Sequence, residues 1–347
     1  MTFEDWNQFL AEQNTPAASN IAYAKQASSV VVMPLLHQGL LRVTGTDASK
    51  FLQGQLTCNV NLANVGTSLL GAACNPQGRM YSSFRLMPAD NDQGPGFFLR
   101  MRSDIIETTA ATLSKYIVFY KAKVIEERNT FVGIGVSGTS SPDLIKRVFG
   151  AAPSEPNQLI NIDQTIIIKL PGKTLRFECW LPVETAKRYW QRLTETAETG
   201  SVNNWLLADI SDGIGEVSAV NSEAFIPQML NFDKVEAISF TKGCYTGQEV
   251  VARLQYRGKS KRTMVKISVR NGPLLEPGQT LHVPEKEQSS ATVVTSAIAG
   301  KTTNKTIQNA LVVISTEFLA NNNAELCLDN DCFNAEITAL PANIPVQ

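Results

Sequence analysis

Two successive stretches of the chain show the same alternation of strand-like and helix-like patterns, and this repeated order constrains the fold more than any other feature. The first stretch runs from about residue 30 to 128. Within it, Asn75-Pro76-Gln77-Gly78 is a turn sequence between two alternating apolar segments, which predicts a hairpin. The expected elements are strands 40–44, 69–74, 80–87, 97–101 and 121–126 and helices 47–53 and 103–116.

The second stretch has the same order of elements but not the same sequence. Ser141-Pro142 is a typical helix start, and Gly150 is a typical stop. The expected elements are strands 130–136, 166–170 and 175–181, helices 141–150 and 182–197, and a last element at 205–210. Each stretch therefore predicts the β-α-β-β-α-β order of a ferredoxin-like unit.

From Arg262 onward the pattern changes to short strand-like runs separated by turn sequences such as Glu276-Pro277-Gly278. The expected strands are 264–269, 280–283, 291–296, 310–314, 325–328 and 333–338. No amphipathic helix pattern interrupts them, so this part predicts a small all-β barrel or sandwich. The sequence thus predicts an α+β protein with domains at 1–128, 129–261 and 262–347.

The charge balance leaves the class of partner open. The 31 basic and 32 acidic residues nearly cancel, so a nucleic-acid or membrane partner has to be inferred from local clusters. The stretch from Met1 to Asn20 is polar and acidic and lacks the features of a signal peptide. No apolar run approaches the ~20 residues that span a bilayer. We therefore expect a cytoplasmic protein.

The cysteines are spaced without any C-x-x-C pair, and the chain has only two histidines, which argues against a zinc site. In a reducing compartment all six cysteines are expected as free thiols. Five of them lie in apolar or strand-like surroundings and are expected in the core: Cys58, Cys74, Cys179, Cys327 and Cys332. The sixth, Cys244, lies in different surroundings.

The segment around Cys244 carries most of the chemical information in the sequence. Thr246 and Glu249 have the spacing of a capping box, so a helix is expected over 247–256. Cys244 then precedes a helix N-terminus and has Lys242 two residues away, and both features favour a thiolate. A reactive or ligating thiol is one interpretation, and a small residue in a tight turn is the other.

Beyond this helix, the stretch from Arg253 to Arg262 contains five basic residues and no acidic ones. One interpretation is an anion site for a ligand carboxylate, a phosphate or RNA. The other is a solvated linker into the C-terminal β-structure.

The motif from Lys242 to Glu249, Lys-Gly-Cys-Tyr-Thr-Gly-Gln-Glu, resembles the signature of the YgfZ family of folate-binding proteins. Residues 225–228 and 251–258 match this family too, as do Gly45-Thr46-Asp47-Ala48 and 51–55. The resemblance covers nearly the whole chain after residue 35. It implies an aminomethyltransferase-like fold, in which two ferredoxin-like β-α-β-β-α-β blocks surround a central folate cavity and a small β-barrel follows at the C-terminus.

The resemblance also implies a function. It points to tetrahydrofolate, or a one-carbon derivative, as the cofactor, and to roles in tRNA modification and in the maturation or repair of iron–sulfur proteins. Folate, iron–sulfur enzymes and tRNA are therefore the expected partners of a monomer with no membrane association. Cys244, with Lys242 near it, is the expected functional thiolate.

Not every site residue of the wider fold family carries over to this chain. In the aminomethyltransferases, a turn like Asn75–Arg79 leads into two aspartates, one of which is needed for aminomethyl transfer. Ser82 and Ser83 stand at these positions here. A serine hydroxyl cannot replace a carboxylate as the charged partner of the folate amine, so glycine-cleavage activity is not expected.

Folate contacts are expected at positions that match those of the family. Trp205 stands where the YgfZ family has a folate-contacting tryptophan, and Gln38 where it has a second one. The glutamate of the fold family falls at Ser211, so Asp212 or Asp209 is expected to accept hydrogen bonds from the pterin ring. Core packing is the alternative for Trp205. The expected cofactor-binding residues are Trp205, Gln38, Asp212, Arg253 and Arg257.

Three functions follow from these patterns. The first is a folate-dependent accessory protein in which Cys244 acts as a thiolate. The second is an aminomethyltransferase or another folate-dependent one-carbon enzyme, against which Ser82 and Ser83 argue. The third is a binding module without chemistry, which recognises tRNA or a protein through Arg257, Lys259 and Lys261.

Overall fold

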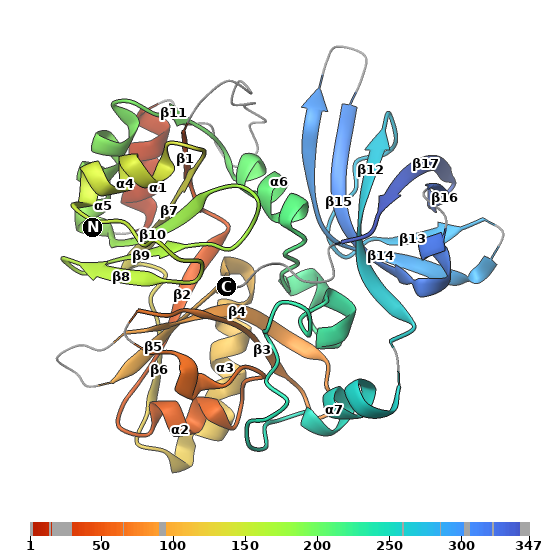
Figure 1. The fold of residues 1–347 in the computed structure, drawn as a ribbon, viewed down its shortest axis with the longest axis horizontal. Coiled ribbons are helices and arrows are strands. Elements are labelled where there is room, and N and C mark those ends of the chain that lie inside the picture. Colours follow the sequence, from red (N-terminus) through yellow and green to blue (C-terminus); the bar gives the residue numbers. More distant parts are fainter. Residues whose placement is uncertain are drawn as a thin grey trace.

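The computed structural model contains two α/β lobes and a β-barrel, arranged around a central junction (Figure 1). Helix α6 (Val202–Asp212) and the chain that follows it run through this junction. The structure describes residues 3–13, 15, 30–64, 66–89, 95–258, 260–284, 286–301, 306–320 and 323–340. None of the helices in these ranges is long and apolar enough to cross a bilayer.

The first lobe has the expected elements in the expected order, and its five-stranded sheet contains the ferredoxin-like unit with one additional strand at its edge. Its strands pair in the order β3-β4-β5-β2-β6. Gly78 has a φ of 72° in the turn between β3 and β4, a conformation that favours glycine. The helices and strands are β2 (Gln38–Thr44), α2 (Ala48–Gln53), η1 (Val60–Leu62), β3 (Leu69–Cys74), β4 (Met80–Pro88), β5 (Gly96–Arg102), η2 (Ser103–Ile105), α3 (Ile106–Tyr116), η3 (Ile117–Phe119) and β6 (Lys123–Glu126).

The register of β2 and β5 brings polar residues to the junction. The two strands are antiparallel, with Gln38 opposite Arg102. Arg100 lies opposite Arg85 of β4. Because side chains alternate along a strand, Arg100 and Arg102 share one face of β5, whereas Leu99 and Met101 lie in the core on the other.

The second lobe is a sheet with the strand order β11-β1-β7-β10-β9-β8. The N-terminal strand β1 is inserted between β11, to which it is parallel, and β7, to which it is antiparallel. Helix α1 packs on α5 through an edge-on contact between the rings of Trp6 and Trp190, whose centroids are 5.8 Å apart. The elements are α1 (Phe3–Glu12), β1 (Val31–Pro34), β7 (Phe131–Ser137), α4 (Ser141–Phe149), β8 (Leu159–Ile162), β9 (Thr165–Lys169), β10 (Arg176–Pro182), α5 (Val183–Thr194) and β11 (Glu198–Thr199).

The structure of this part differs from the sequence expectations in two respects. The last element expected for the second lobe was wrong in type, because residues 205–210 belong to helix α6 and the lobe closes with the short strand β11. Ser201 and Asn204 form the capping box that starts α6. In addition, α1 and β1 pack on the second lobe, although residues 1–128 were expected to form the first domain. The boundaries themselves stay predictions.

Helix α7 (Gln248–Arg257) is the helix expected after Cys244. The expected capping box is absent, however, because Gly247 is the N-cap with a φ of 82° and no side chain caps the helix. Thr246 bonds the first lobe instead, where its backbone N–H donates to Gly54 O at 3.2 Å. Between α6 and α7 the chain forms η4 (Ala219–Asn221) and η5 (Pro227–Leu230) and is otherwise irregular.

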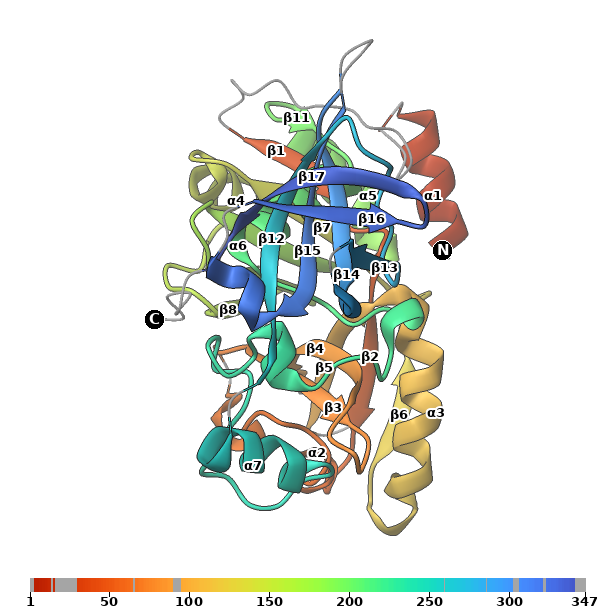
Figure 2. The ribbon, with the colours of Figure 1, turned by 90° about the vertical axis from the view of Figure 1, so that its right-hand side faces the viewer.

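The C-terminal part is a closed barrel, as predicted, with the strand order β12-β15-β14-β13-β16-β17 (Figure 2). We call residues 213–247, between α6 and α7, the linker. One apolar core joins the barrel to the first lobe and to this linker through residues such as Met264, Val294 and Phe225. The strands are β12 (Arg262–Arg270), β13 (Thr280–Val283), β14 (Lys286–Lys301), β15 (Thr306–Ser315), β16 (Asn323–Leu328) and β17 (Asp331–Thr338), and η6 (Thr316–Ala320) precedes β16.

The prediction of six free thiols was wrong for Cys327 and Cys332. These residues lie opposite each other in the β16–β17 hairpin and form a disulfide. Their spacing across a short turn makes them cross-strand neighbours, which the sequence reasoning missed. The other four cysteines are free, and Cys244 is the exposed one among them.

Candidate functional site

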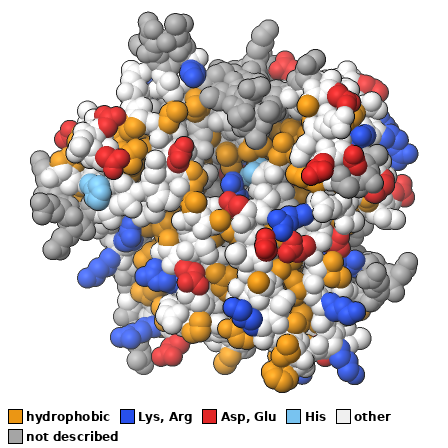
Figure 3. Space-filling view, turned by 180° about the vertical axis from the view of Figure 1, so that it is seen from behind, with side chains coloured by type: hydrophobic (Ala, Val, Ile, Leu, Met, Phe, Trp, Pro, Cys, Tyr) orange, Lys and Arg blue, Asp and Glu red, His pale blue; other side chains and the backbone are white. Residues whose placement is uncertain are grey.

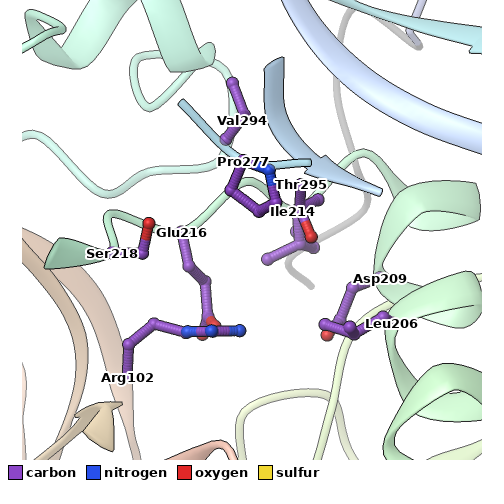
Figure 4. A pocket seen from close by; sticks show the side chains of 9 residues that line it. All are labelled: Arg102, Leu206, Asp209, Ile214, Glu216, Ser218, Pro277, Val294 and Thr295. Atoms are coloured by element: carbon purple, nitrogen blue, oxygen red, sulfur yellow. The ribbon is translucent and has the colours of Figure 1, made fainter. Parts of the chain in front are cut away.

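The first lobe, helix α6, the chain that follows it and the barrel line a narrow cavity of about 10 Å³, which has room for about one water molecule. Figure 4 shows Arg102 and Glu216 extending toward it from one side, and Leu206 and Asp209 of α6 from the other. Seen from behind, the molecule is hollowed near its centre, where charged and hydrophobic side chains meet (Figure 3). The narrow cavity thus combines charged groups with apolar walls, but as it stands it has no room for a ring system.

A buried ion network beside this cavity links both lobes to the linker after α6. Arg100 of β5 bonds Glu178 of β10 at 2.9 Å and pairs with Glu216 of the linker. The side chains of Arg100, Glu178 and Glu216 are 6%, 1% and 18% exposed. Gln38 donates to Glu216 Oε2 at 2.6 Å, and Trp180 donates to Glu178 Oε2 at 3.0 Å. The network therefore fixes Gln38 relative to the carboxylate in the cavity wall.

The charged groups of this network stabilise one another in their ionised forms. Burial is the largest single effect and raises the pKa of the Glu216 carboxyl, but the Arg100 guanidinium, His37, Arg102 and the Gln38 hydrogen bond together outweigh it, so the net pKa lies below its usual value. Burial lowers the pKa of Arg100, but Glu178 and Glu216 together raise it above its usual value. Burial also lowers the pKa of His37 to about 3, which keeps this neighbour of Gln38 neutral. The junction is therefore a fixed pattern of charge near neutral pH.

A second ion network holds the predicted residues Trp205 and Asp212. Arg176 of β10 bonds Asp209 and Asp212 of α6, each at 2.6 Å, and its guanidinium covers the Trp205 ring at 4.9 Å. The Trp205 side chain is nearly inaccessible and packs against Gly135. Burial raises the pKa of Asp209 to about 6, although Arg176 opposes this shift. Trp205 and Asp212 thus share Arg176 as their partner, whereas Gln38 belongs to the Arg100 network.

A larger hollow, of about 480 Å³, lies next to Gln38. Its apolar wall includes Leu36 and Phe131, and its polar groups include Gln38, Asp104 and Arg128. Gln38 separates it from the narrow cavity, because the same side chain bonds Glu216. This volume and this mixture of apolar walls with a few polar groups are typical of small-molecule sites.

Cys244 lies apart from both cavities, on an exposed loop that packs on the first lobe. Lys242 turns inward, because its ammonium group donates to Leu56 O at 2.7 Å and Cys58 O at 2.8 Å. Burial lowers the pKa of Lys242 to about 8. Lys242 therefore anchors the loop, and Cys244 lies three positions before the N-cap Gly247 of α7.

Ser82 and Ser83 are both buried in β4. Ser82 Oγ lies 3.8 Å from Met101 Sδ, and Ser83 Oγ accepts a hydrogen bond from the Val217 N–H at 2.8 Å. Ser83 also lines a second cavity of about 10 Å³, together with Glu216. Ser83 thus holds the linker in place, whereas Ser82 contacts β5, and the carboxylate that lines the same cavity as Ser83 comes from Glu216.

The basic stretch from Arg253 to Arg262, which begins within α7, does not act as one unit. Arg253 is exposed on α7 and lines neither cavity at the junction. Arg262 turns into the barrel and donates to Val313 O at 3.1 Å. Lys259 lies outside the described residues, as does the side chain of Arg257. The binding roles expected for Arg253 and Arg257 stay predictions.

Sequence reasoning missed the residues that organise the junction, which are Arg100, Glu178 and Glu216. Glu216 follows the run Gly213-Ile214-Gly215. An acidic residue directly after these glycines is the sequence signal that could have pointed to a site residue. In the part of the chain that the structure describes, no group of three or more His, Cys, Asp or Glu side chains is arranged to hold a metal ion.

Comparison with known proteins places this architecture in a family. No protein-family model matches the chain. It is 33% identical to the tRNA-modifying protein YgfZ of Yersinia pestis (strain Pestoides F) over 251 residues, which are 72% of this chain and 74% of the relative. The protein of the same name from Yersinia pseudotuberculosis serotype O:1b (strain IP 31758) is 32% identical over the same shares.

The fold has a solved counterpart as well. The glycine cleavage system aminomethyltransferase T from Bartonella henselae superposes with a TM-score of 0.71 at 15% identity, covering 91% of this chain and 86% of that one. This likeness confirms the aminomethyltransferase-like fold of two lobes and a barrel. Together with the sequence identity to its relatives, it shows that the chain belongs to the YgfZ family.

Proposed function

We propose that this protein binds a tetrahydrofolate in the 480 Å³ hollow beside Gln38 and serves tRNA modification and iron–sulfur protein maturation as an accessory protein, with Cys244 as its functional thiol. The observation that carries the proposal is this hollow, in whose wall Gln38 is held by Glu216 and Arg100. The aminomethyltransferase-like fold supports the choice of a folate, and the name of the relatives supports a role in tRNA modification.

The residues of the hollow fit a folate by their chemistry. A pterin ring is flat and carries several N–H donors, which suit the apolar walls Leu36 and Phe131 and the oxygens of Gln38 and Asp104. Arg128, which pairs with Glu126 at 2.5 Å, is the cation in the lining that can also reach the carboxylates of the glutamate tail. The narrow cavity does not fit the ring, because it holds about 10 Å³.

The folate, when bound, supplies a carrier for one-carbon units. Gln38 orients the ligand, because its amide is fixed on both sides, donating to Glu216 and accepting from Arg100 at 3.3 Å. Leu36 and Phe131 exclude water from one side of the hollow. Cys244 is exposed on its loop, so an iron–sulfur species, as cargo, can reach its sulfur from solution.

Titration of the purified protein with tetrahydrofolate, followed by tryptophan fluorescence, tests the folate site. We expect Gln38→Ala to weaken binding about fivefold, the loss that one hydrogen bond implies. Gln255→Ala, on the exposed side of α7, is the matched control and leaves binding unchanged. Wild-type protein that binds no tetrahydrofolate overturns the proposal. Weaker tetrahydrofolate binding by Trp205→Phe in calorimetry, with Gln38→Ala unaffected, moves the ligand to the Arg176 side of the junction.

Complementation tests the thiol. In a strain that lacks this protein, we expect Cys244→Ala to reduce tRNA methylthiolation and the activity of iron–sulfur enzymes. Cys179→Ala, at a buried thiol of the second lobe, is the control and retains both activities. Full rescue by Cys244→Ala removes the thiol role and leaves the folate site standing.

A further inference from the structure

The turn between α3 and β6 exposes large apolar side chains that nothing in the described chain covers. Phe119 is 93% exposed, Val118 68% and Tyr116 44%. Exposed apolar side chains that cluster in this way are typical of interaction sites. We call residues 115–123 the aromatic–lysine turn.

The turn is held rigidly at its base, although its tip is exposed. Asp47 accepts a hydrogen bond from the Lys121 N–H at 2.8 Å, and its own N–H donates to Lys121 O at 3.2 Å. Gly45 has a φ of 128°, and a Cβ at this position would lie 2.3 Å from Lys121 O. The Tyr120 ring packs against Phe51 at 5.2 Å. The Gly45-Thr46-Asp47 motif therefore serves to present the turn in one conformation.

The charge of the turn has one sign. Lys115, Lys121 and Lys123 are exposed, and the sequence from 115 to 123, Lys-Tyr-Ile-Val-Phe-Tyr-Lys-Ala-Lys, contains no acid. Lysines that alternate with exposed aromatic rings are typical of surfaces that bind single-stranded nucleic acid, where bases stack on the rings and phosphates pair with the cations.

The turn also lies on the lobe that carries the Cys244 loop. Its base bonds Asp47, directly before α2, and Thr246 of the Cys244 loop bonds Gly54, directly after α2. Asp47 and Gly54 lie at the two ends of the six-residue helix α2 and are therefore about 10 Å apart. Figures 1 and 2 both place α2, α3 and α7 together at the end of the molecule away from the second lobe. One extended ligand can therefore contact both segments.

We propose that the aromatic–lysine turn is an RNA-binding surface, on which unpaired bases stack against Phe119 and Tyr116 while Lys115, Lys121 and Lys123 contact phosphates. The proposal rests on the tRNA part of the proposed function and adds the surface that meets the RNA. Charge complementarity favours a polyanion, and the exposed ring faces favour one with unpaired bases. The surface differs from the Arg253–Arg262 stretch, which the sequence alone singled out.

Binding of unmodified tRNA transcripts to the full chain, measured by fluorescence anisotropy, tests the aromatic part. We expect Phe119→Ala to weaken binding about fivefold or more, because one base loses its stacking partner. Phe119→Leu keeps an apolar side chain but has no ring face, so we expect it to weaken binding as well. Leu274→Ala removes a similarly exposed apolar side chain, 57% exposed, from the barrel side and is the control.

The salt dependence of binding tests the lysines. The logarithm of the association constant falls linearly with the logarithm of the salt concentration. We expect Lys115→Gln, Lys121→Gln and Lys123→Gln each to make this slope less negative by about 0.7–0.9, because each variant loses one phosphate contact. Lys301→Gln, at an exposed lysine of β14, leaves the slope unchanged.

The outcomes separate this inference from the function on which it rests. Wild-type protein that binds no tRNA overturns both the RNA surface and the tRNA role, and tetrahydrofolate binding then decides the folate part alone. Tight tRNA binding that the turn variants do not change overturns the surface only. Full affinity in Phe119→Leu overturns base stacking, and stronger binding to vesicles of anionic lipid than to tRNA identifies a membrane surface instead.

Discussion

The central junction and the Cys244 end of the first lobe are held together in opposite ways. At the junction, Arg100 joins side chains from β5, β10 and the linker, and all of them are largely out of water. Around Cys244, a continuous loop is anchored by backbone contacts and by the inward-facing Lys242, and the Cys244 thiol faces solvent. The junction therefore determines how the lobes sit, whereas the loop exposes the Cys244 thiol to solvent. Substitutions at the junction are therefore expected to change mainly the free energy of unfolding, and substitutions at Cys244 mainly the reactivity of the thiol.

The largest effect on stability is expected at the junction. Arg100→Met leaves the carboxylates of Glu178 and Glu216 buried without their cation, so the free energy of unfolding is expected to fall by about 3–5 kcal/mol. Urea denaturation followed by circular dichroism measures this loss. Arg128→Met is the control, because its pair with Glu126 is exposed and is expected to contribute about 0–1 kcal/mol. Equal losses in the two variants would contradict the structural importance of the buried network.

The next largest effect is expected where the Cys244 loop meets the first lobe. Gly247 has a φ of 82°, which costs another residue about 1–3 kcal/mol, and a Cβ there would lie 2.5 Å from Asn75 O. We therefore expect Gly247→Ala to lower the unfolding free energy by at least this amount. Gly243→Ala in the same loop is the control, since a Cβ at Gly243 meets no atom within 4 Å. A large loss in both variants would mean that the loop tolerates no side chain at either position.

Lys242 gives a smaller effect that depends on pH. Lys242→Met leaves Leu56 O and Cys58 O without their donor, which is expected to cost about 1–3 kcal/mol at neutral pH. Burial lowers the pKa of Lys242 to about 8, whereas an unfolded lysine titrates near pH 10.4. Between these values the unfolded chain retains a proton that the folded chain has lost, so stability from this group rises with pH.

The measurement is the difference in unfolding free energy between wild type and Lys242→Met across pH 7 to 10.5. We expect this difference to grow above about pH 8, because the wild type gains stability there and the variant lacks the group. A difference that shrinks with rising pH would mean that the charged ammonium, and not its burial, dominates the contact.

The same contrast explains what the sequence predicted and what it did not. The hairpin at Asn75–Gly78 and helix α7 depend on neighbours in the chain, so local patterns predicted them. Glu216 meets Arg100 across 116 positions, and no local pattern contains that information. Residues 205–210 were assigned wrongly because a short apolar run fits a strand and a buried helix face equally well. The family motif located Cys244, yet the inward turn of Lys242 depends on carbonyl groups of the first lobe.

Cys244 is expected to show the smallest effect on stability and a clear effect on reactivity. Because it is exposed, Cys244→Ser is expected to change the unfolding free energy by no more than about 0.5 kcal/mol. Burial raises the pKa of Cys58 and Cys74 to about 12, so each has roughly a thousandfold smaller thiolate fraction than a cysteine whose pKa is unshifted. Alkylation of the native protein, with mass spectrometry to locate the modified residue, is therefore expected to show one fast thiol, which Cys244→Ser removes. Fast modification of Cys58 or Cys74 instead would mean that the first lobe opens where the loop packs on it, and the contrast between a solvent-facing thiol and a closed core would not hold.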